Sequence, residues 1–343
     1  MRAGKVMRPM VSILIPAYNA APWIADTIRS AQRQTWDRRE IIIVDDGSND
    51  QTLLVAREFA SKEVFVVTQD NQGASAARNK ALTLCQGDYI QWLDADDLLG
   101  DDKISKQMEF VERCDNPRTL FSSEWGRFMY CASRAKFVAT PLWTDLSPVE
   151  WLLRKLAQNL HMQPATWLVS REITEAAGPW DARLSLDDDG EYFCRVILAS
   201  DGIQFVTGAK SFYRMSGFNS LSNVDQSDKK LESLWLSLQF HIRYLCSLED
   251  SLRTRAACLT YLKNWLGCFY PDRMDIVERA QQLATALGGN LGLPRLRWKY
   301  AWIEKILGRE TANRAQVFMP NVKTFLMMSW DKTMFHLEKA GDV

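Results

Sequence analysis

The stretch that decides the fold is Val11-Ser12-Ile13-Leu14-Ile15-Pro16-Ala17-Tyr18-Asn19, a β-branched apolar run that is closed by a proline. A second run of this kind, Ile41-Ile42-Ile43-Val44, is closed by Asp45-Asp46-Gly47-Ser48. Both runs predict buried strands that end at polar turns. Residues 23–34 place apolar side chains at helical spacing, so the chain is expected to open as strand, helix, strand.

The same alternation continues to about residue 97. We expect helices over about 50–60 and 74–84, and strands over 64–67 and 89–93. This order predicts an α/β fold with a mostly parallel sheet flanked by crossover helices. Further along, the periodicity predicts a helix over 148–160, a strand over 165–169, and a helical region from about 225 that is broken at 288–294.

Composition excludes several classes of protein. The 343 residues include 42 basic and 42 acidic ones, so no net positive charge is available to hold a nucleic acid. Seven cysteines form no CxxC pair, which is typical of a reducing compartment. The sequence shows no secretory leader pattern and no apolar run of about 18 residues. We therefore expect a cytoplasmic protein whose membrane contact, if any, is peripheral.

Acidic residues follow the predicted strands. Asp45-Asp46 comes after the second strand, and Asp94-Ala95-Asp96-Asp97 comes after the strand at 89–93. Ligands bind beyond the carboxyl ends of strands in open α/β sheets, and carboxylates two residues apart can hold a divalent cation. Each acidic turn alone is also typical of a helix cap. Their combination at several strand ends favours a binding site.

Four ordered motifs resemble family 2 glycosyltransferases, which have the GT-A fold. They are the opening strand at 11–19, Ile43 to Asp50, Asn71 to Asn79 and Gly87 to Asp97. The similarity is close over about the first 110 residues and looser to about residue 222. It implies a nucleotide-diphospho-sugar donor, with a UDP-sugar favoured, and Mn²⁺ or Mg²⁺ as cofactor.

The resemblance also implies roles for single residues. Tyr18 would stack on the donor base, Asp46 would accept a hydrogen bond from it with Asp45 in support, and Asp96 with Asp94 would hold the metal and the ribose. Arg214 with Ser220 and Ser222 would close over the diphosphate. The full set predicted for the donor is Pro16, Tyr18, Asn19, Asp45, Asp46, Gly73, Arg78, Asp94 and Arg214.

The catalytic base is expected from a second acidic segment, Gly178 to Asp181 followed by Leu186 to Arg195, which resembles the acceptor segment of the family. Alignment on Arg195 makes Asp189 the base that deprotonates the acceptor in an inverting transfer. A shift of one residue within the run of three aspartates would make it Asp188. Mutual repulsion would raise one pKa toward neutrality, as a general base requires. A plain helix cap is the alternative interpretation.

The predicted organisation is a catalytic domain over 1–224 and a helical domain over 225–343. Residues 8–110 would bind the nucleotide and 111–224 the acceptor, a glycan or a lipid-linked sugar. The helical domain would contact a membrane surface or partner through residues such as Trp298 and Trp302, or simply pack on the catalytic domain. The alternatives are a non-catalytic nucleotide-sugar-binding or scaffold protein and a nucleotidyltransferase. A nucleotidyltransferase usually has a glycine- and lysine-rich phosphate loop near its first strand, and this sequence has none there.

Overall fold

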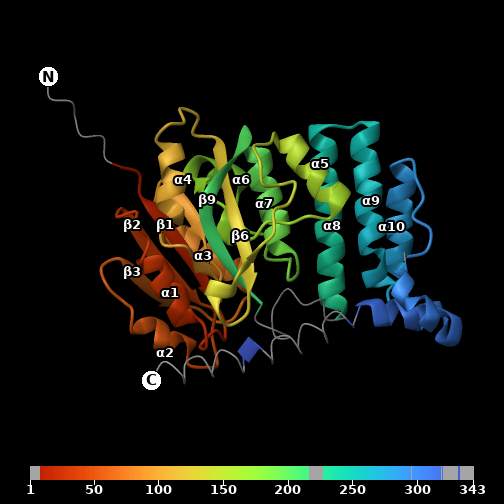
Figure 1. Ribbon diagram of the computed structural model, residues 1–343, viewed down its shortest axis with the longest axis horizontal. Helices are drawn as coiled ribbons and strands as arrows, with labels where there is room; N and C mark the ends of the chain where they lie inside the picture. The colour runs from red at the N-terminus through yellow and green to blue at the C-terminus, as the bar shows by residue number, and fades with distance from the viewer. Residues whose placement is uncertain (1–7, 216–226, 295, 318, 320–330, 333–343) are drawn as a thin grey trace.

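The computed structural model describes residues 8–215, 227–294, 296–317, 319 and 331–332. In these parts the chain folds into a five-stranded sheet, a four-stranded sheet and helices that flank them (Figure 1). This is the predicted α/β fold with a helical C-terminal region. Within the described ranges, no helix combines the length and the apolar character needed to cross a bilayer.

The predicted strands form the parallel part of the larger sheet. They are β1 (Val11–Ala17), β2 (Arg39–Asp45), β3 (Val64–Thr68) and β4 (Tyr89–Trp92), and they are joined by α1 (Ile24–Gln32), α2 (Thr52–Arg57) and α3 (Ala74–Leu84). A short strand, β8 (Val169–Ser170), pairs antiparallel with β4. The order of strands is therefore β3-β2-β1-β4-β8.

The prediction of a strand over 165–169 is wrong for most of that range. Pro164–Thr166 form a turn of 3₁₀ helix (η2), and Val169 is the first residue of the run that pairs in β8. Trp167 and Leu168 are nevertheless fully buried. A short apolar run indicates burial without distinguishing a strand from another buried segment.

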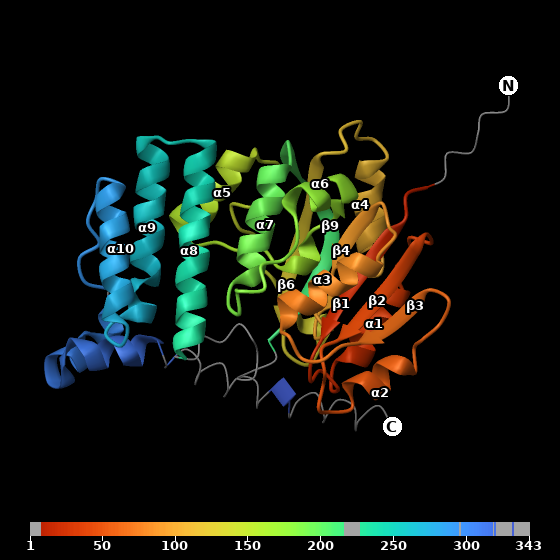
Figure 2. The same ribbon diagram turned by 180° about the vertical axis from the view of Figure 1, so that it is seen from behind.

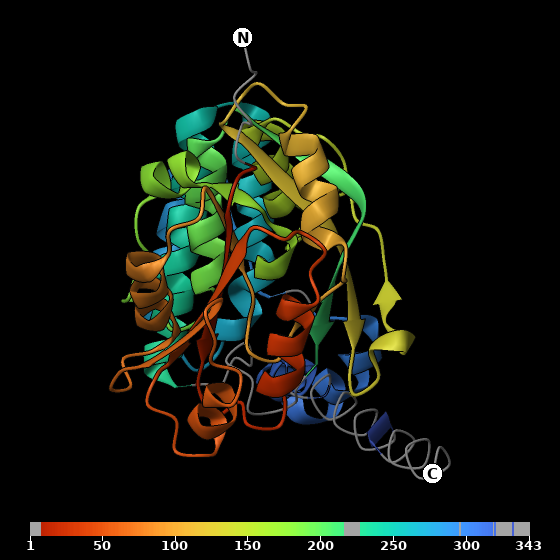
Figure 3. The same cartoon turned by 90° about the vertical axis from the view of Figure 1, so that its left-hand side faces the viewer.

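Alternation along the parallel strands feeds two cores. Leu14 and Ile42 face a cluster that includes Ala77 of α3, whereas Ile13 and Ile43 face a cluster that includes Ile28 of α1. Successive side chains of a strand point to opposite faces, so both faces of this sheet are covered. Figure 3 shows helices on both sides of the strands.

The second sheet was not predicted from the sequence. It consists of β5 (Leu98–Leu99), β9 (Gly202–Arg214), β6 (Thr119–Phe128) and β7 (Lys136–Phe137), in that order, with α4 (Lys103–Val111) after β5 and a 3₁₀ turn η1 (Ala132–Arg134) before β7. The two long strands, β6 and β9, run parallel, with a register shift between Ser123 and Glu124. The sheet brings the end of β9 beside the turn that follows β4.

Helices fill the rest of the described chain. They are α5 (Pro148–Gln158), α6 (Arg171–Ala177), α7 (Asp188–Ala199), α8 (Asp228–Leu248), α9 (Leu252–Phe269) and α10 (Met274–Ala286). α8, α9 and α10 stand side by side, with α5 and α7 between them and the sheets (Figure 2). A single hydrophobic cluster extends from Leu14 of β1 to Trp235 of α8 and Ala284 of α10.

The predicted break after α10 is confirmed. Gly288 has a φ of 83°, and the chain continues into a 3₁₀ turn η3 (Trp298–Tyr300) and helical residues 301–317. This last segment lies at the lower end of the molecule in Figures 1 and 3.

Candidate functional site

The strand order brings the predicted donor residues to one edge of the larger sheet. β2 and β4 flank β1 and run parallel to it, with Ala17 opposite Asp45 and Leu14 opposite Trp92. Residues 18–19, 46–48 and 94–97 therefore follow the strands at a common carboxyl edge. Ligands bind at this edge in open α/β sheets.

Asp46 fixes the loop that leads into α3. Its Oδ1 accepts hydrogen bonds from Gln69 Nε2 (2.8 Å) and from the Gln72 N–H (3.0 Å), and its Oδ2 accepts one from the Gly73 N–H (2.8 Å). Gly73 caps α3 with a φ of 94°, a left-handed value that favours glycine. The carboxylate predicted to bind the donor base thus already has protein partners on both oxygens.

Asp45 is buried next to this loop and is less completely paired. Its Oδ2 accepts hydrogen bonds from Thr68 Oγ1 (3.1 Å) and the Ser48 N–H (3.3 Å). In the part of the chain that the structure describes, Asp45 Oδ1 has no hydrogen-bond partner. Leaving a buried acceptor unpaired is unfavourable. Asp45 Oδ1 is therefore suited to accept a hydrogen bond from a ligand at the sheet edge.

The turns after β1 and β2 brace each other. The Asn19 N–H donates to Ser48 Oγ (2.9 Å), and Asn19 Oδ1 accepts from the Asn49 N–H (2.9 Å). Asn19 has a φ of 49°, which asparagine tolerates better than most residues. Pro16 is buried at the end of β1, whereas 44% of the Tyr18 surface is exposed. Tyr18 thus remains available to a ligand.

Arg78 on α3 joins the two acidic segments. Its Nη2 donates to Asp94 Oδ1 (2.9 Å) and its Nη1 to Asp188 Oδ2 (2.6 Å). The guanidinium carbon lies 4.3 Å from the ring centroid of buried Trp180. Burial lowers the pKa of Arg78, but the Asp188 and Asp94 carboxylates outweigh it and raise the pKa above its ordinary value. A permanent positive charge therefore sits between these carboxylates.

The turn after β4 has exposed and buried acidic groups. Asp94 and Asp96 are partly exposed, whereas Asp97 is buried and its Oδ1 accepts from the Arg214 N–H (2.8 Å). Burial, followed by the charges of Asp96 and Asp94, raises the pKa of Asp97 well above its ordinary value. The Thr27 hydroxyl donates to the Ala95 and Asp97 carbonyl oxygens (both 2.9 Å), which fixes this turn against α1.

Arg214 supports the same turn from the end of β9. Its Nε donates to the Asp96 carbonyl oxygen (2.7 Å), and its guanidinium lies over the rings of Trp23 and Phe128. The side chain is almost fully buried, which lowers the pKa of Arg214. Its predicted contact with the diphosphate stays a prediction, and Ser220 and Ser222 lie outside the described residues.

The three aspartates of the acceptor segment differ in their partners. Asp188 Oδ2 accepts from Arg78 and from Ser75 Oγ (3.2 Å), so its charge is neutralised by an ion pair. Asp189 Oδ1 accepts from the Gly190 N–H (2.8 Å). Burial, and then the Asp188 and Asp187 charges, raises the pKa of Asp189 to about 7. Asp189 is thus a carboxylate whose pKa suits proton transfer near neutral pH.

The third aspartate, Asp187, links this segment to the C-terminal helices. It has a φ of 58°, caps α7 and accepts a hydrogen bond from Ser237 Oγ of α8. Ser233, one turn earlier on α8, accepts from the Ser185 N–H (2.8 Å) and the Leu186 N–H (3.0 Å). α8 therefore holds the backbone that precedes Asp188 and Asp189.

Buried groups behind Asp187 extend this support to α9. His241 Nδ1 lies 2.8 Å from Tyr261 Oη of α9 and 3.8 Å from Asp187 Oδ2. Burial lowers the pKa of His241 to about 4, so the imidazole is neutral at pH 7. Asp187 thus contacts hydroxyl and imidazole groups here without forming a full ion pair.

The carboxylates in the turn after β4 fit the divalent cation that the resemblance implies. Among the described residues, no three or more His, Cys, Asp or Glu side chains are grouped to hold an ion by themselves. Mg²⁺ commonly binds through one or two carboxylates together with substrate phosphates. The partly exposed carboxylates of Asp94 and Asp96 suit a cation that is shared with a diphosphate.

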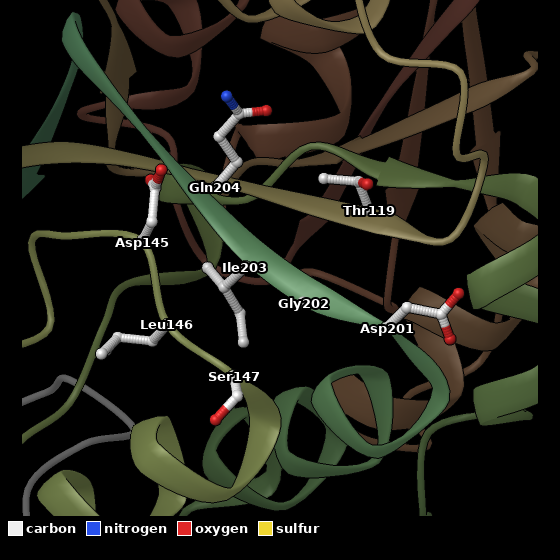
Figure 4. Close-up of a pocket in the computed structure, with 8 residues that line it drawn as sticks. All are labelled: Thr119, Asp145, Leu146, Ser147, Asp201, Gly202, Ile203 and Gln204. Atoms are coloured by element: carbon white, nitrogen blue, oxygen red, sulfur yellow. The ribbon is translucent and has the colours of Figure 1, made fainter.

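A shallow cavity of about 450 Å³ lies far from these residues (Figure 4). Its walls include Thr119 and Gly202, the first residues of β6 and β9, whereas Arg214 is the last residue of the 13-residue β9. A strand of that length extends about 40 Å. The cavity is therefore at the other end of the second sheet and does not belong to the candidate site.

The roles of three side chains that shape the site were not predicted from the sequence. Ser75 and Trp180 stand within or beside the motifs, but a serine and a tryptophan of this kind give no signal that separates them from ordinary packing. The extra aspartate, Asp187, was a departure from the family pattern and could have indicated a separate role.

Comparison with known proteins identifies the family. Residues 12–123 match the family model described as glycosyl transferase family 2. EpsJ of Bacillus subtilis, described as an uncharacterized glycosyltransferase, is 37% identical over 246 residues, which cover 69% of this chain and 70% of EpsJ. The chain belongs to glycosyltransferase family 2. Two other curated relatives, both described as glycosyltransferases, align over only 30% of this chain, and the chain spans 42% of their length.

Solved structures of glycosyltransferases share the fold. TarS of S. aureus in complex with UDP has a TM-score of 0.59 at 16% identity, covering 90% of this chain and 91% of that one. The mannosyltransferase PcManGT of Pyrobaculum calidifontis, in complex with GDP-Man and Mn²⁺, has a TM-score of 0.51 at 17% identity, covering 95% and 89%. The predicted GT-A fold is thereby confirmed.

Proposed function

We propose that this family 2 member is an inverting glycosyltransferase that moves one sugar from a nucleotide-diphospho-sugar to a hydroxyl group of a glycan or lipid-linked acceptor. The observation that carries the proposal is the double ion pair of Arg78. It ties Asp94, beside the donor edge of the sheet, to Asp188, beside the acceptor segment. A transferase needs donor and acceptor groups held in one fixed geometry.

Asp189 is the proposed base. Asp188 is engaged by Arg78 and Ser75, whereas Asp189 has a pKa raised to about 7. In the proposed step Asp189 takes the proton of the acceptor hydroxyl while the oxygen of that hydroxyl bonds to the anomeric carbon of the donor sugar. The carbon–oxygen bond to the diphosphate breaks, and its electron pair leaves with the diphosphate. Attack opposite the leaving group inverts the configuration.

The donor would bind along the carboxyl edge of the sheet. Tyr18 would stack on the base, Asp45 and Asp46 would accept its N–H groups, and Pro16, Asn19 and Gly73 would shape the pocket. Asp96, with Asp94, would hold Mn²⁺ or Mg²⁺, which neutralises charge on the departing diphosphate. A UDP-sugar is the donor we favour from the family resemblance; TarS was solved with UDP and PcManGT with GDP-Man, so both bases belong in the test.

The reaction is proposed for the cytoplasm, with residues 1–224 as the catalytic domain and 225–343 as a helical domain that can touch a membrane. All seven cysteines are unpaired, which suits a reducing compartment. A nucleotidyltransferase or a non-catalytic nucleotide-sugar-binding protein remains the alternative. The Pro16–Asn19 turn offers neither glycine nor lysine for a phosphate loop, which disfavours the former.

The deciding experiment measures nucleoside diphosphate released from a panel of UDP- and GDP-sugars, with and without Mn²⁺ or Mg²⁺. We expect metal-dependent release that Asp96→Asn abolishes and Asp37→Asn leaves intact, because Asp37 is an exposed aspartate outside the site. Binding without release by the intact chain would indicate the non-catalytic alternative. Metal-dependent release of nucleoside diphosphate that is unchanged by Asp96→Asn would show that the metal ligand is misassigned.

A further inference from the structure

The segment that follows α10 exposes large apolar side chains beside basic ones. Trp298 is 89% exposed, Trp302 60% and Ile306 70%. These three residues recur every four positions, so in a helical segment they lie along one face. Leu307 is also exposed. Tyr300 and Ile303 are buried in a small separate core, so the segment has one packed face and one apolar face turned to solvent.

Exposed cations surround this apolar face. Arg297, Lys299 and Lys305 are exposed, and the exposed acidic residue in the same stretch is Glu310. Glu304 is occupied by an ion pair with Arg309 (3.0 Å). We define the C-terminal patch by its apolar and basic members: Trp298, Trp302, Ile306, Leu307, Arg297, Lys299 and Lys305.

The segment that carries the C-terminal patch lies below α9 and α10, far from β1 and β2 along the long axis but on the same lower side of the molecule (Figures 1 and 2). Asn313 Nδ2 donates to the Tyr270 carbonyl oxygen after α9 (2.7 Å), which ties the segment to the end of that helix. Further along, Asp331 accepts from the Tyr130 N–H (3.0 Å), and the Tyr130 ring contacts Trp23 beside Arg214.

We propose that the C-terminal patch docks the protein on an anionic phospholipid bilayer, with the carboxyl edge of the sheet turned toward that surface. Tryptophan is favoured at the membrane interface because its ring is apolar and its N–H is polar. Aromatic side chains can each bury roughly 150–250 Å² there, and neighbouring lysines and arginines are attracted to anionic headgroups. A protein partner would not require the cations that border the tryptophans. Docking in this orientation presents the site to an acceptor in the membrane.

Vesicle co-sedimentation of the full chain tests the proposal without donor or acceptor. Vesicles of phosphatidylcholine and phosphatidylglycerol in equal parts should bind the protein, vesicles of phosphatidylcholine alone should bind it less, and added salt should weaken binding. The double variant Trp298→Ser/Trp302→Ser should lower the partition coefficient at least about tenfold. Leu252→Ser is the matched control, because Leu252 is 89% exposed at the start of α9.

Charge reversal gives a second measurement. Lys305→Glu should weaken binding to the anionic vesicles by about fivefold or more, whereas Lys62→Glu, an exposed lysine before β3, should change it little. Thermal unfolding of each variant should match that of the parent chain, since the substituted side chains are exposed. Failure of the parent chain to bind anionic vesicles, or undiminished binding by the tryptophan variant, would overturn the proposal. Nucleotide release from soluble donor is measured separately, so a failure there concerns the proposed function alone.

Discussion

The turn at Asp94–Asp97 and the turn at Asp187–Asp189 each contain three aspartates and share Arg78, but different parts of the chain hold them. The first is fixed by residues of the two sheets and their helices, Thr27 of α1 and Arg214 of β9. The second is fixed by the C-terminal helices, through Ser233 and Ser237 of α8.

This difference shows that the helical region supports one of the two turns directly. Its hydroxyl groups hold the backbone before the proposed base, whereas Thr27 and Arg214, both outside that region, hold the proposed metal turn. Changes in α8 should therefore affect the acceptor turn and spare the donor turn. Substitutions in each turn, in Arg78 and in α8 can separate effects on the acceptor turn from effects on the donor turn.

The largest effect is expected from Asp189→Asn, which keeps the shape of the side chain and removes its basicity. General-base assistance is typically worth about 10² to 10⁴ in rate, so transfer should fall by that factor while donor binding persists. Turnover and nucleotide binding should be measured on the same preparation. Asp188→Asn is the matched variant one position away.

The outcome also decides between the two aspartates. Near-normal transfer by Asp189→Asn together with loss in Asp188→Asn would move the base to Asp188. A product that retains the configuration of the donor would contradict the inverting mechanism, whichever aspartate is involved.

Arg78→Ala should break the link between the turns. It leaves the Asp94 and Asp188 carboxylates without their shared cation, and removal of one partner from a buried ion pair costs about 3 kcal/mol. Chemical denaturation should show this loss of unfolding free energy. Arg78→Lys keeps the charge but cannot donate from two fixed nitrogens, so we expect partial recovery of stability with poor transfer. Equal stability of all three proteins would show that the bridge is unimportant.

Ser237→Ala should weaken the acceptor turn alone. It removes the hydroxyl that donates to Asp187, a loss of about 1–2 kcal/mol. The turnover number should fall about tenfold, because the base is less firmly positioned, and the KM for the donor should stay unchanged. Ser247→Ala is the control, because Ser247 lies near the end of the same helix and its exposed hydroxyl donates to the Tyr244 carbonyl oxygen (2.8 Å). A shift in donor KM would mean that the two turns are not supported independently.

Much of the donor side was predictable from the sequence. β1, β2 and β4 are rich in apolar residues, and burial on both faces of a parallel sheet leaves this clear pattern. The polar residues that end them are adjacent in sequence to the strands that place them, so Asp45 and Asp94 could be assigned to one edge. Local sequence and tertiary position coincide there.

The acceptor side depends on contacts that sequence periodicity does not record. β6 and β9 mix glycine, serine and charged residues with apolar ones, and their pairing includes a register shift, so neither strand leaves a regular apolar pattern. The choice between Asp188 and Asp189 rests on the position of Arg78, which is 110 residues away from Asp188 in the chain. The support by Ser237 becomes visible only when α8 is packed against α7.

The pH dependence of stability isolates Asp189 without an assay of transfer. In the folded chain its pKa is raised to about 7 by burial and by the Asp188 and Asp187 charges, with Arg78 opposing them. The folded state therefore binds this proton more tightly than the unfolded state, so its contribution to stability declines as pH rises from about 4 to about 7. Asp97 contributes in the same direction, while buried His241, whose pKa is lowered to about 4, contributes in the opposite one. The useful quantity is thus the difference between parent and Asp189→Asn, measured by denaturation at several pH values. That difference should change across this window and level off above about pH 7; a difference that is constant with pH would show that Asp189 ionises normally and is poorly suited to act as the base.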